Sequence, residues 1–255
     1  MGDEVVSVDS GREAPASTRP AFYALAPGGW RDYVTILHLP YTAWHLSYVV
    51  IGGCLAATVA WGRLGAAVVA FALAVGVGAH SLDELHGRPL RTRIPSAVLV
   101  ALAVVSIAAA CAIGIAGGLA YEPWLVLLVP VGLFLVLAYN LELAGGRFHS
   151  DLWFGLAWGG FPLVCGYAAV AGDIRAVTLL GASFAVLLSL AQRTLSSQVR
   201  RVRRRARSVH GELELRDGSS EPIDDSVLTR TPEHALRLLT AAIVVLAATL
   251  VVMRL

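Results

Sequence analysis

The chain has 255 residues, of which 56% are hydrophobic and only 15% are charged, and its formal net charge is +2. Ordinary soluble domains carry about 25% charged residues. The composition therefore excludes a typical soluble domain and indicates a polytopic membrane protein.

The N-terminal segment, residues 1–29, is more polar than the chain that follows it. It contains several acidic residues and has no apolar core after a basic start, so it lacks the pattern of a cleaved signal peptide. We expect this segment to form a short, flexible cytoplasmic tail.

Seven stretches are apolar over nearly the whole length that a helix needs to cross a bilayer, which is about 20 residues. They predict an all-α, polytopic helical bundle with about seven transmembrane helices. A six-span core then occupies residues 30–195, and a C-terminal transmembrane helix lies within 232–255. The predicted spans are 41–62, 64–84, 95–117, 122–143, 152–171, 174–192 and 233–253.

Arginines in the connecting loops predict the orientation, because cytoplasmic loops carry an excess of basic residues. They concentrate in the N-terminal tail and in the loops after the second, fourth and sixth spans, whereas the opposite loops contain only Arg63 and Arg175. This distribution predicts a cytoplasmic membrane, with the N-terminus in the cytoplasm and the C-terminus outside. The arginines on the predicted cytoplasmic side are Arg12, Arg19, Arg31, Arg88, Arg91, Arg93, Arg147 and those of residues 200–207.

Histidines and carboxylates gather at the predicted cytoplasmic ends of the spans. The sequence HLPYTAWH (38–45) opens the first span, AHSLDELHGRP (79–89) closes the second, and YNLELAGGRFHSD (139–151) joins the fourth to the fifth. Ionisable groups at the edge of a span usually face the bundle interior or a wet cavity, because lipid solvates them poorly. We therefore expect these three segments to meet in one polar pocket.

This combination of side chains predicts a metal site. Neighbours three and four apart share a helix face, and helical bundles build metal sites from carboxylates and imidazoles at that spacing. Mixed nitrogen and oxygen ligands favour iron, zinc or manganese. We expect Glu84 and Asp151 to transfer protons or orient ligands, and so to be the catalytic candidates. The predicted metal ligands are His38, His45, His80, Asp83, His86, Glu142 and His149.

Structural roles compete with this interpretation. Asp83, Glu84 and His86 could cap the second span and pair with Arg88 or Arg91 in the loop that follows. A histidine beside aromatic residues at a span end, as His45 is, is often an anchor at the level of the lipid head groups.

The loop predicted at 196–231 begins with the basic sequence VRRVRRRARSV (199–209). Arginines directly after a span more often bind anionic lipid head groups than nucleic acid, and each contributes about 1 kcal/mol near the membrane surface. We expect lipid head groups at Arg200–Arg207 and no nucleic acid. The acidic, turn-rich residues 211–226 predict a solvated linker or a small hairpin.

The segments described above resemble the UbiA superfamily of intramembrane prenyltransferases over about residues 30–190. AHSLDELHGRPLRTRIPS (79–96) stands where that family has its first aspartate-rich motif, and 139–167 is similar to the segment around its fifth span. The resemblance implies magnesium-dependent transfer of a prenyl group from an allylic diphosphate. Two features depart from the family. Only Asp83 matches a metal-binding aspartate of the first motif, and AQRTLSSQVRRVRRR (191–205) has no carboxylate where the second motif should be.

Three functions follow from these observations. The first is a metal-dependent membrane enzyme of UbiA-like fold that acts on a lipid or isoprenoid at the cytoplasmic interface. The second is the magnesium-dependent transferase itself, with Gln192, Arg193 and Arg200 replacing the second motif as diphosphate ligands. The third is a proton-coupled carrier or assembly factor without enzymatic activity. The candidate substrate-binding residues are Tyr41, Asn140, Arg88, Gln192 and Arg193.

Overall fold

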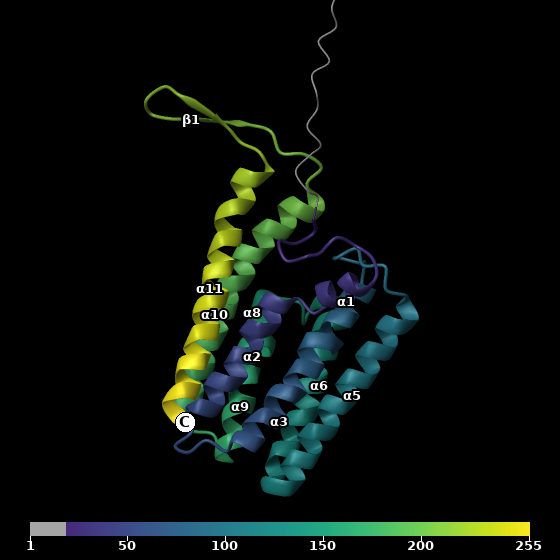
Figure 1. Cartoon of the computed structure of the whole chain (residues 1–255), viewed down its shortest axis with the longest axis vertical. Helices are drawn as coiled ribbons and strands as arrows, with labels where there is room; N and C mark the ends of the chain where they lie inside the picture. Colours follow the sequence, from purple (N-terminus) through teal and green to yellow (C-terminus); the bar gives the residue numbers. More distant parts are fainter. Residues whose placement is uncertain (1–18) are drawn as a thin grey trace, which may run out of the picture.

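Long helices run up and down beside one another in the computed structural model, which describes residues 19–255 (Figure 1). A short helix α1 (Trp30–Ile36) precedes α2 (Leu39–Cys54), and the next segment combines α3 (Trp61–Phe71), the π-helical η1 (Ala72–Ala79) and α4 (His80–Leu85). The remaining elements are α5 (Ser96–Tyr121), the 3₁₀-helix η2 (Pro123–Leu127), α6 (Leu128–Asn140), α7 (Leu143–Gly146), α8 (Asp151–Phe154), the π-helical η3 (Gly155–Gly160), α9 (Phe161–Ala171), α10 (Ala176–Arg200), the π-helical η4 (Arg201–Arg205), β1 (Glu212–Glu214), β2 (Ser220–Pro222) and α11 (Asp225–Arg254).

Six of these helical segments are long and apolar enough to cross a membrane, as in a multi-pass membrane protein. They are Trp61–Leu85, Ser96–Tyr121, Pro123–Asn140, Asp151–Ala171, Ala176–Arg205 and Asp225–Arg254. The first predicted span does not reach this length, because α2 has 16 residues and ends at Cys54. The structure therefore supports six of the seven predicted spans.

The outer surface of the bundle is apolar. Val105, Leu180 and Val252 are exposed by 67%, 72% and 71%, and many other large aliphatic side chains are exposed with them. A surface this apolar is unfavourable in water but suits contact with lipid acyl chains.

Helix α2 lies in the interior of the bundle, where it packs against α9 and α11. Glycines permit the close approach of α2 to α9: a Cβ atom at Gly52 would lie 2.1 Å from the carbonyl oxygen of Leu163, and one at Gly166 would lie 2.1 Å from that of Val49. Small residues at such crossings let helix backbones come into contact, which is the main route to tight packing inside membranes.

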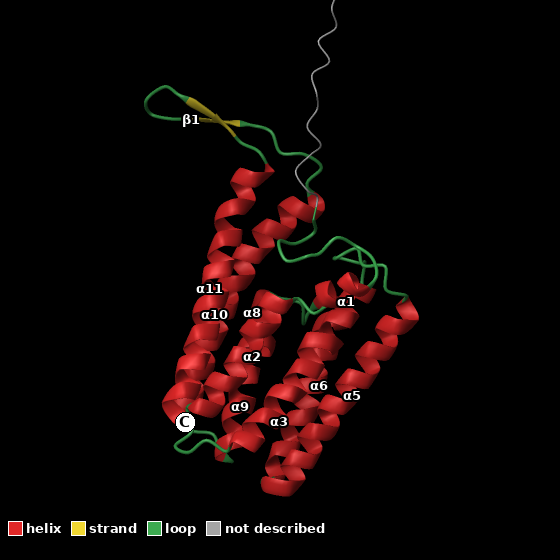
Figure 2. Cartoon of the chain, in the orientation of Figure 1, coloured by secondary structure: helices red, strands yellow, loops and turns green. Residues whose placement is uncertain are grey.

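The predicted arginine-rich loop is shorter than expected. The helix of the sixth predicted span continues through α10 and η4 to Arg205, and α11 begins at Asp225, so only residues 206–224 lie outside helices. Arginine has a high helix propensity, and the basic residues extend the helix beyond its apolar part. The turn-rich residues form an exposed antiparallel hairpin of β1 and β2, which projects from one end of the molecule (Figure 2).

The hairpin, α1 and the loop 86–95 all lie at this same end of the bundle, whereas the C-terminus lies at the other end (Figure 1). Residues 19–29, which the sequence assigned to a flexible tail, also pack here: Ala21 and Ala24 are buried against Leu90. The remainder of the predicted tail, 1–18, lies outside the described residues. The polar end of the molecule is therefore a layer of short segments over the helix ends.

Candidate functional site

A polar cavity of about 350 Å³ lies beneath this layer, between the ends of α2, α4, α6, α8 and α10. The three segments that the sequence predicts to meet all contribute side chains to it. The cavity is lined by all seven predicted metal ligands, His38, His45, His80, Asp83, His86, Glu142 and His149, and by four predicted substrate-binding residues, Tyr41, Asn140, Gln192 and Arg193. We refer to this space as the polar cavity.

Three of its histidines are oriented by backbone carbonyl groups. The Nδ1 atom of His45 lies 2.7 Å from the carbonyl oxygen of Trp158 in η3, and that of His80 lies 3.3 Å from Gly76 in η1. His149 has the same arrangement, with Nδ1 at 3.1 Å from the Tyr139 oxygen. Because a carbonyl only accepts, each Nδ1 carries the proton, and each Nε2 keeps its lone pair. Two of these acceptors lie in π-helical turns, which often occur at functional sites.

The histidines are not arranged to share one metal ion. The rings of His38 and His80 stack with their centroids 4.0 Å apart and their planes 11° apart. The lone pair of an imidazole nitrogen lies in the ring plane, and two stacked, nearly parallel planes do not meet, so these two rings cannot both bind one ion in their planes about 2.0–2.1 Å from each nitrogen. Among residues 19–255, no three His, Cys, Asp or Glu side chains are grouped as a metal site requires. Metal binding stays a prediction that this geometry does not support.

The two histidines of the segment 38–45 lie in different backbone conformations. Helix α2 begins at Leu39, with Pro40 in its first turn, and His38 precedes it in the left-handed conformation at φ 46° and ψ 45°. Proline has no backbone N–H and favours a helix start, so the helix excludes His38, and His38 and His45 do not share a helix face. His38 reaches the polar cavity from the turn and not from the helix.

A stripe of polar side chains from α10 and η4 forms one wall of the polar cavity. Gln192, Ser196, Arg200 and Arg204 follow one another at intervals of four residues, which places them on one helix face. Arg200 donates to the hydroxyl oxygens of Ser196 at 3.1 Å and Ser197 at 2.9 Å. Among residues 19–255, neither Arg200 nor Arg204 forms an ion pair with a carboxylate. Arg205 also lines the cavity and is likewise unpaired within that range.

Arg193, in contrast, is held by contacts within the protein. Its guanidinium donates to the carboxylate of Asp151, to the hydroxyl of Tyr139 and to the carbonyl oxygen of His149. These contacts join α10 to α6 and to the start of α8. They orient the cavity wall and use three of the five guanidinium N–H groups of Arg193.

Three predicted site residues do not line the polar cavity. Both carboxylate oxygens of Glu84, which is 1% exposed, accept hydrogen bonds from the loop 86–95: Oε2 from the backbone N–H of Leu90, and Oε1 from the N–H and hydroxyl of Thr92. The side chain of Asp151 is 76% exposed and pairs with Arg193. Arg88 folds back on its own loop and donates to the carbonyl oxygen of Ile94 at 2.6 Å. The geometry therefore gives these three residues structural contacts.

The sequence analysis missed several residues of the cavity. Tyr23 was assigned to the flexible tail, and Arg204 and Arg205 were assigned only to lipid head groups outside the bundle, whereas Arg200 was also a candidate diphosphate ligand. The four-residue spacing from Gln192 to Arg204 is the signal that could have placed the arginines on the cavity wall. Head-group binding stays a prediction for the exposed Arg201 and Arg207.

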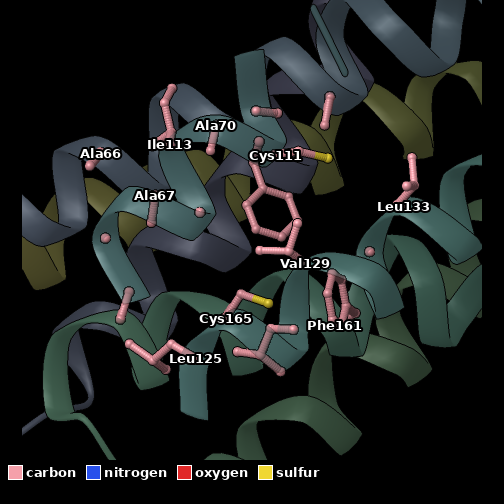
Figure 3. A pocket seen from close by; sticks show the side chains of 18 of the residues that line it. Ala66, Ala67, Ala70, Cys111, Ile113, Leu125, Val129, Leu133, Phe161 and Cys165 are labelled. Carbon is pink, nitrogen blue, oxygen red and sulfur yellow. The ribbon is translucent and has the colours of Figure 1, made fainter. Parts of the chain in front are cut away.

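A second, mostly apolar cavity of about 180 Å³ lies between α3, η1, α5, α6 and α9, and its lining also includes Arg63 and Tyr121. Small residues such as Ala67 and Ala70 leave space there, and the side chains drawn in Figure 3 carry only carbon, apart from the sulfur atoms of Cys111 and Cys165. Val75 and Trp158 line both this apolar cavity and the polar cavity. The two spaces therefore adjoin, with a basic, hydrogen-bonding end and an apolar end.

Comparison of the chain with known protein families, with curated proteins and with solved structures finds no match.

Proposed function

We propose that the protein is an integral membrane enzyme that acts on a lipid or isoprenoid carrying a phosphate or diphosphate head. One observation carries the proposal: arginines that pair with no carboxylate among residues 19–255 line a polar cavity that adjoins an apolar cavity. An amphiphile fits that division, because its charged head and its hydrocarbon tail need opposite surroundings.

The head group is assigned to the stripe on α10 and η4. Arg200 and Arg204 present guanidinium groups to the polar cavity, and guanidinium matches the geometry of phosphate oxygens with strong, charge-assisted hydrogen bonds. Gln192 and Ser196 lie on the same stripe and add neutral polar groups. A buried site of this sign attracts an anion and repels a cation.

The tail is assigned to the apolar cavity. Its lining is mostly alanine, glycine and large apolar residues such as Phe71, Leu128 and Phe161, which offer dispersion contacts to a hydrocarbon chain, and Arg63 and Tyr121 are its main polar members. The shared residues Val75 and Trp158 mark the point where head and tail would join.

The chemistry is assigned to the groups that face the head. His45 and His80 keep an unprotonated Nε2, and the Asp83 side chain makes no hydrogen bond or ion pair with other residues in 19–255, so all three are able to accept a proton. This assignment keeps the UbiA-like scaffold and the isoprenoid substrate as part of the proposal. It requires no metal, since the arginines supply the positive charge.

Ligand binding by the purified protein in lipid nanodiscs tests this function. We expect geranylgeranyl diphosphate to bind more tightly than geranylgeraniol, and Arg200→Gln to weaken diphosphate binding about 10- to 150-fold, the effect of losing a hydrogen bond to a charged group. Arg201→Gln is the matched control, because Arg201 is the next residue and is exposed outside the cavity. Equal affinity for the diphosphate and the alcohol contradicts the proposal.

Turnover separates an enzyme from a carrier. Phosphorus NMR of the diphosphate incubated with wild-type protein is expected to show a new phosphate species, which Asp83→Asn reduces. Binding without any change in the ligand assigns the protein to the carriers. Metal analysis of the same preparation tests the predicted metal: a stoichiometric ion that is lost in His80→Ala would require a rearranged histidine set.

A further inference from the structure

The segment 19–25 forms part of the wall of the polar cavity, and arginines of the bundle bind it. Arg203 donates to the carbonyl oxygen of Arg19, and Arg204 donates to that of Pro20, both at 3.4 Å. The guanidinium of Arg237 lies 4.9 Å from the ring centroid of Phe22. Arg203 is itself fixed by Glu233, with Nε at 2.5 Å from Oε1. The segment is thus attached to both α11 and η4.

This segment brings Tyr23 to His38, with the Tyr23 hydroxyl 3.0 Å from Nδ1 of the imidazole. A phenol is a better donor than acceptor, and an unprotonated imidazole nitrogen is a strong acceptor, so the hydroxyl donates and the imidazole proton resides on Nε2. Burial raises the pKa of Tyr23 and lowers the pKa of His38 well below its ordinary value, so both groups stay neutral around pH 7.

His38 combines two features that cost free energy. Its Nε2 is buried and has no hydrogen-bond partner among residues 19–255, although the residue lines the polar cavity. Its backbone is left-handed, a conformation that is unfavourable for a residue with a side chain. Strained residues with unsatisfied polar atoms concentrate at ligand sites, where the ligand supplies the missing partner.

We propose that Tyr23 and His38 form a binding pair, in which Tyr23 holds His38 in the tautomer whose Nε2–H donates to an oxygen of the bound phosphate head. The identity of that oxygen rests on the proposed function, whereas the tautomer does not. The pair adds a neutral donor to the arginines, which suits an acceptor-only ligand. It also makes the segment 19–25 a positioning element of the site, because its displacement removes the hydroxyl that fixes His38.

Nitrogen-15 NMR of the full chain in nanodiscs, labelled at histidine, tests the tautomer without a ligand. His38→Asn identifies the His38 signals by difference, and asparagine is chosen because it tolerates the left-handed backbone. We expect the wild type to show a protonated Nε2 and an unprotonated Nδ1, and Tyr23→Phe to change these signals. Tyr33→Phe is the control, because Tyr33 lies on α1 outside the polar cavity and should leave them unchanged.

The affinity for geranylgeranyl diphosphate provides the second readout. We expect His38→Asn, which removes the donor to a charged ligand, to lower this affinity about 10- to 150-fold. We expect Tyr23→Phe to lower it only about 2- to 10-fold, because this variant keeps the imidazole and removes only the hydroxyl that fixes its tautomer. A proton on Nδ1 of His38 in the wild type, or unchanged His38 signals in Tyr23→Phe, would contradict the proposed Tyr23–His38 pair. Neither result would contradict the proposed head-group site at Arg200 and Arg204. Failure of the wild type to bind any phosphorylated isoprenoid overturns the proposed function and the ligand of this pair together.

Discussion

Replacing Glu84 separates a structural carboxylate from a functional one. Glu84 and Asp83 are adjacent on α4, yet Glu84 bonds to the loop 86–95, whereas Asp83 lines the polar cavity. Adjacent residues on a helix point about 100° apart, so both carboxylates cannot face the same space. Glu84→Gln keeps the shape of the side chain and replaces one acceptor oxygen with an amide donor.

The hydrogen bonds of Glu84 determine how much stability its replacement should cost. The amide oxygen can still accept from the N–H and hydroxyl of Thr92, which lie 2.8 Å from Oε1, but the new NH₂ group faces the N–H of Leu90, which lies 3.0 Å from Oε2. Leaving that buried donor unsatisfied costs about 1–3 kcal/mol. Glu84→Ala removes the acceptor of all three bonds, and we expect it to lower the free energy of unfolding by about 3–5 kcal/mol.

Reversible unfolding in detergent measures this loss, and Asp83→Asn is the matched control on the same helical turn. We expect Asp83→Asn to change stability by less than about 1 kcal/mol, because the Asp83 side chain forms no hydrogen bond or ion pair within residues 19–255. Ligand affinity should show the reverse pattern, with Glu84→Gln close to wild type below its unfolding transition. A Glu84→Gln protein of wild-type stability that no longer binds ligand would refute the structural role.

Two further predictions concern packing and pH. Gly166→Ala places a Cβ atom 2.1 Å from the Val49 carbonyl oxygen, and we expect the forced separation of α2 and α9 to lower the free energy of unfolding by about 1–3 kcal/mol. Gly62→Ala is the control, because a Cβ atom there meets nothing within 4 Å. An equal effect of both variants in thermal unfolding would contradict the close crossing of α2 and α9. The lowered pKa of His38 means that the folded chain binds fewer protons at this residue than the unfolded chain does below about pH 6.5. Stability should therefore fall as the pH drops below that value, by at most about 1.4 kcal/mol per pH unit from this residue, and His38→Asn should make the fall shallower. Parallel pH profiles of melting temperature for the two proteins would contradict the neutral, buried imidazole.

Hydropathy and loop charge predicted the long helices and the polar end well, because those patterns reflect the burial of whole segments. Hydropathy did not predict the boundaries of the first span. Residues 55–60 are as apolar on average as the helix before them, so composition did not reveal that α2 ends at Cys54 and α3 begins at Trp61. Helix ends depend on local backbone geometry more than on average hydropathy.

The convergence of three distant segments was predictable because each ends a hairpin on the same side. The roles within the site were less so. Tyr23 reaches the polar cavity through a segment without regular structure, and no periodicity marks such a contact. The arginines of η4 carried a strong signal for loop orientation, and that signal concealed their second position on the cavity wall.

An experimental structure of the protein in nanodiscs with geranylgeranyl diphosphate tests the central claim most directly. The account predicts density for the diphosphate within hydrogen-bonding distance of Arg200 and Arg204, with the hydrocarbon chain passing Val75 and Trp158 into the apolar cavity. Diphosphate bound only at the exposed Arg201 or Arg207, with an unchanged and water-filled polar cavity, would contradict it.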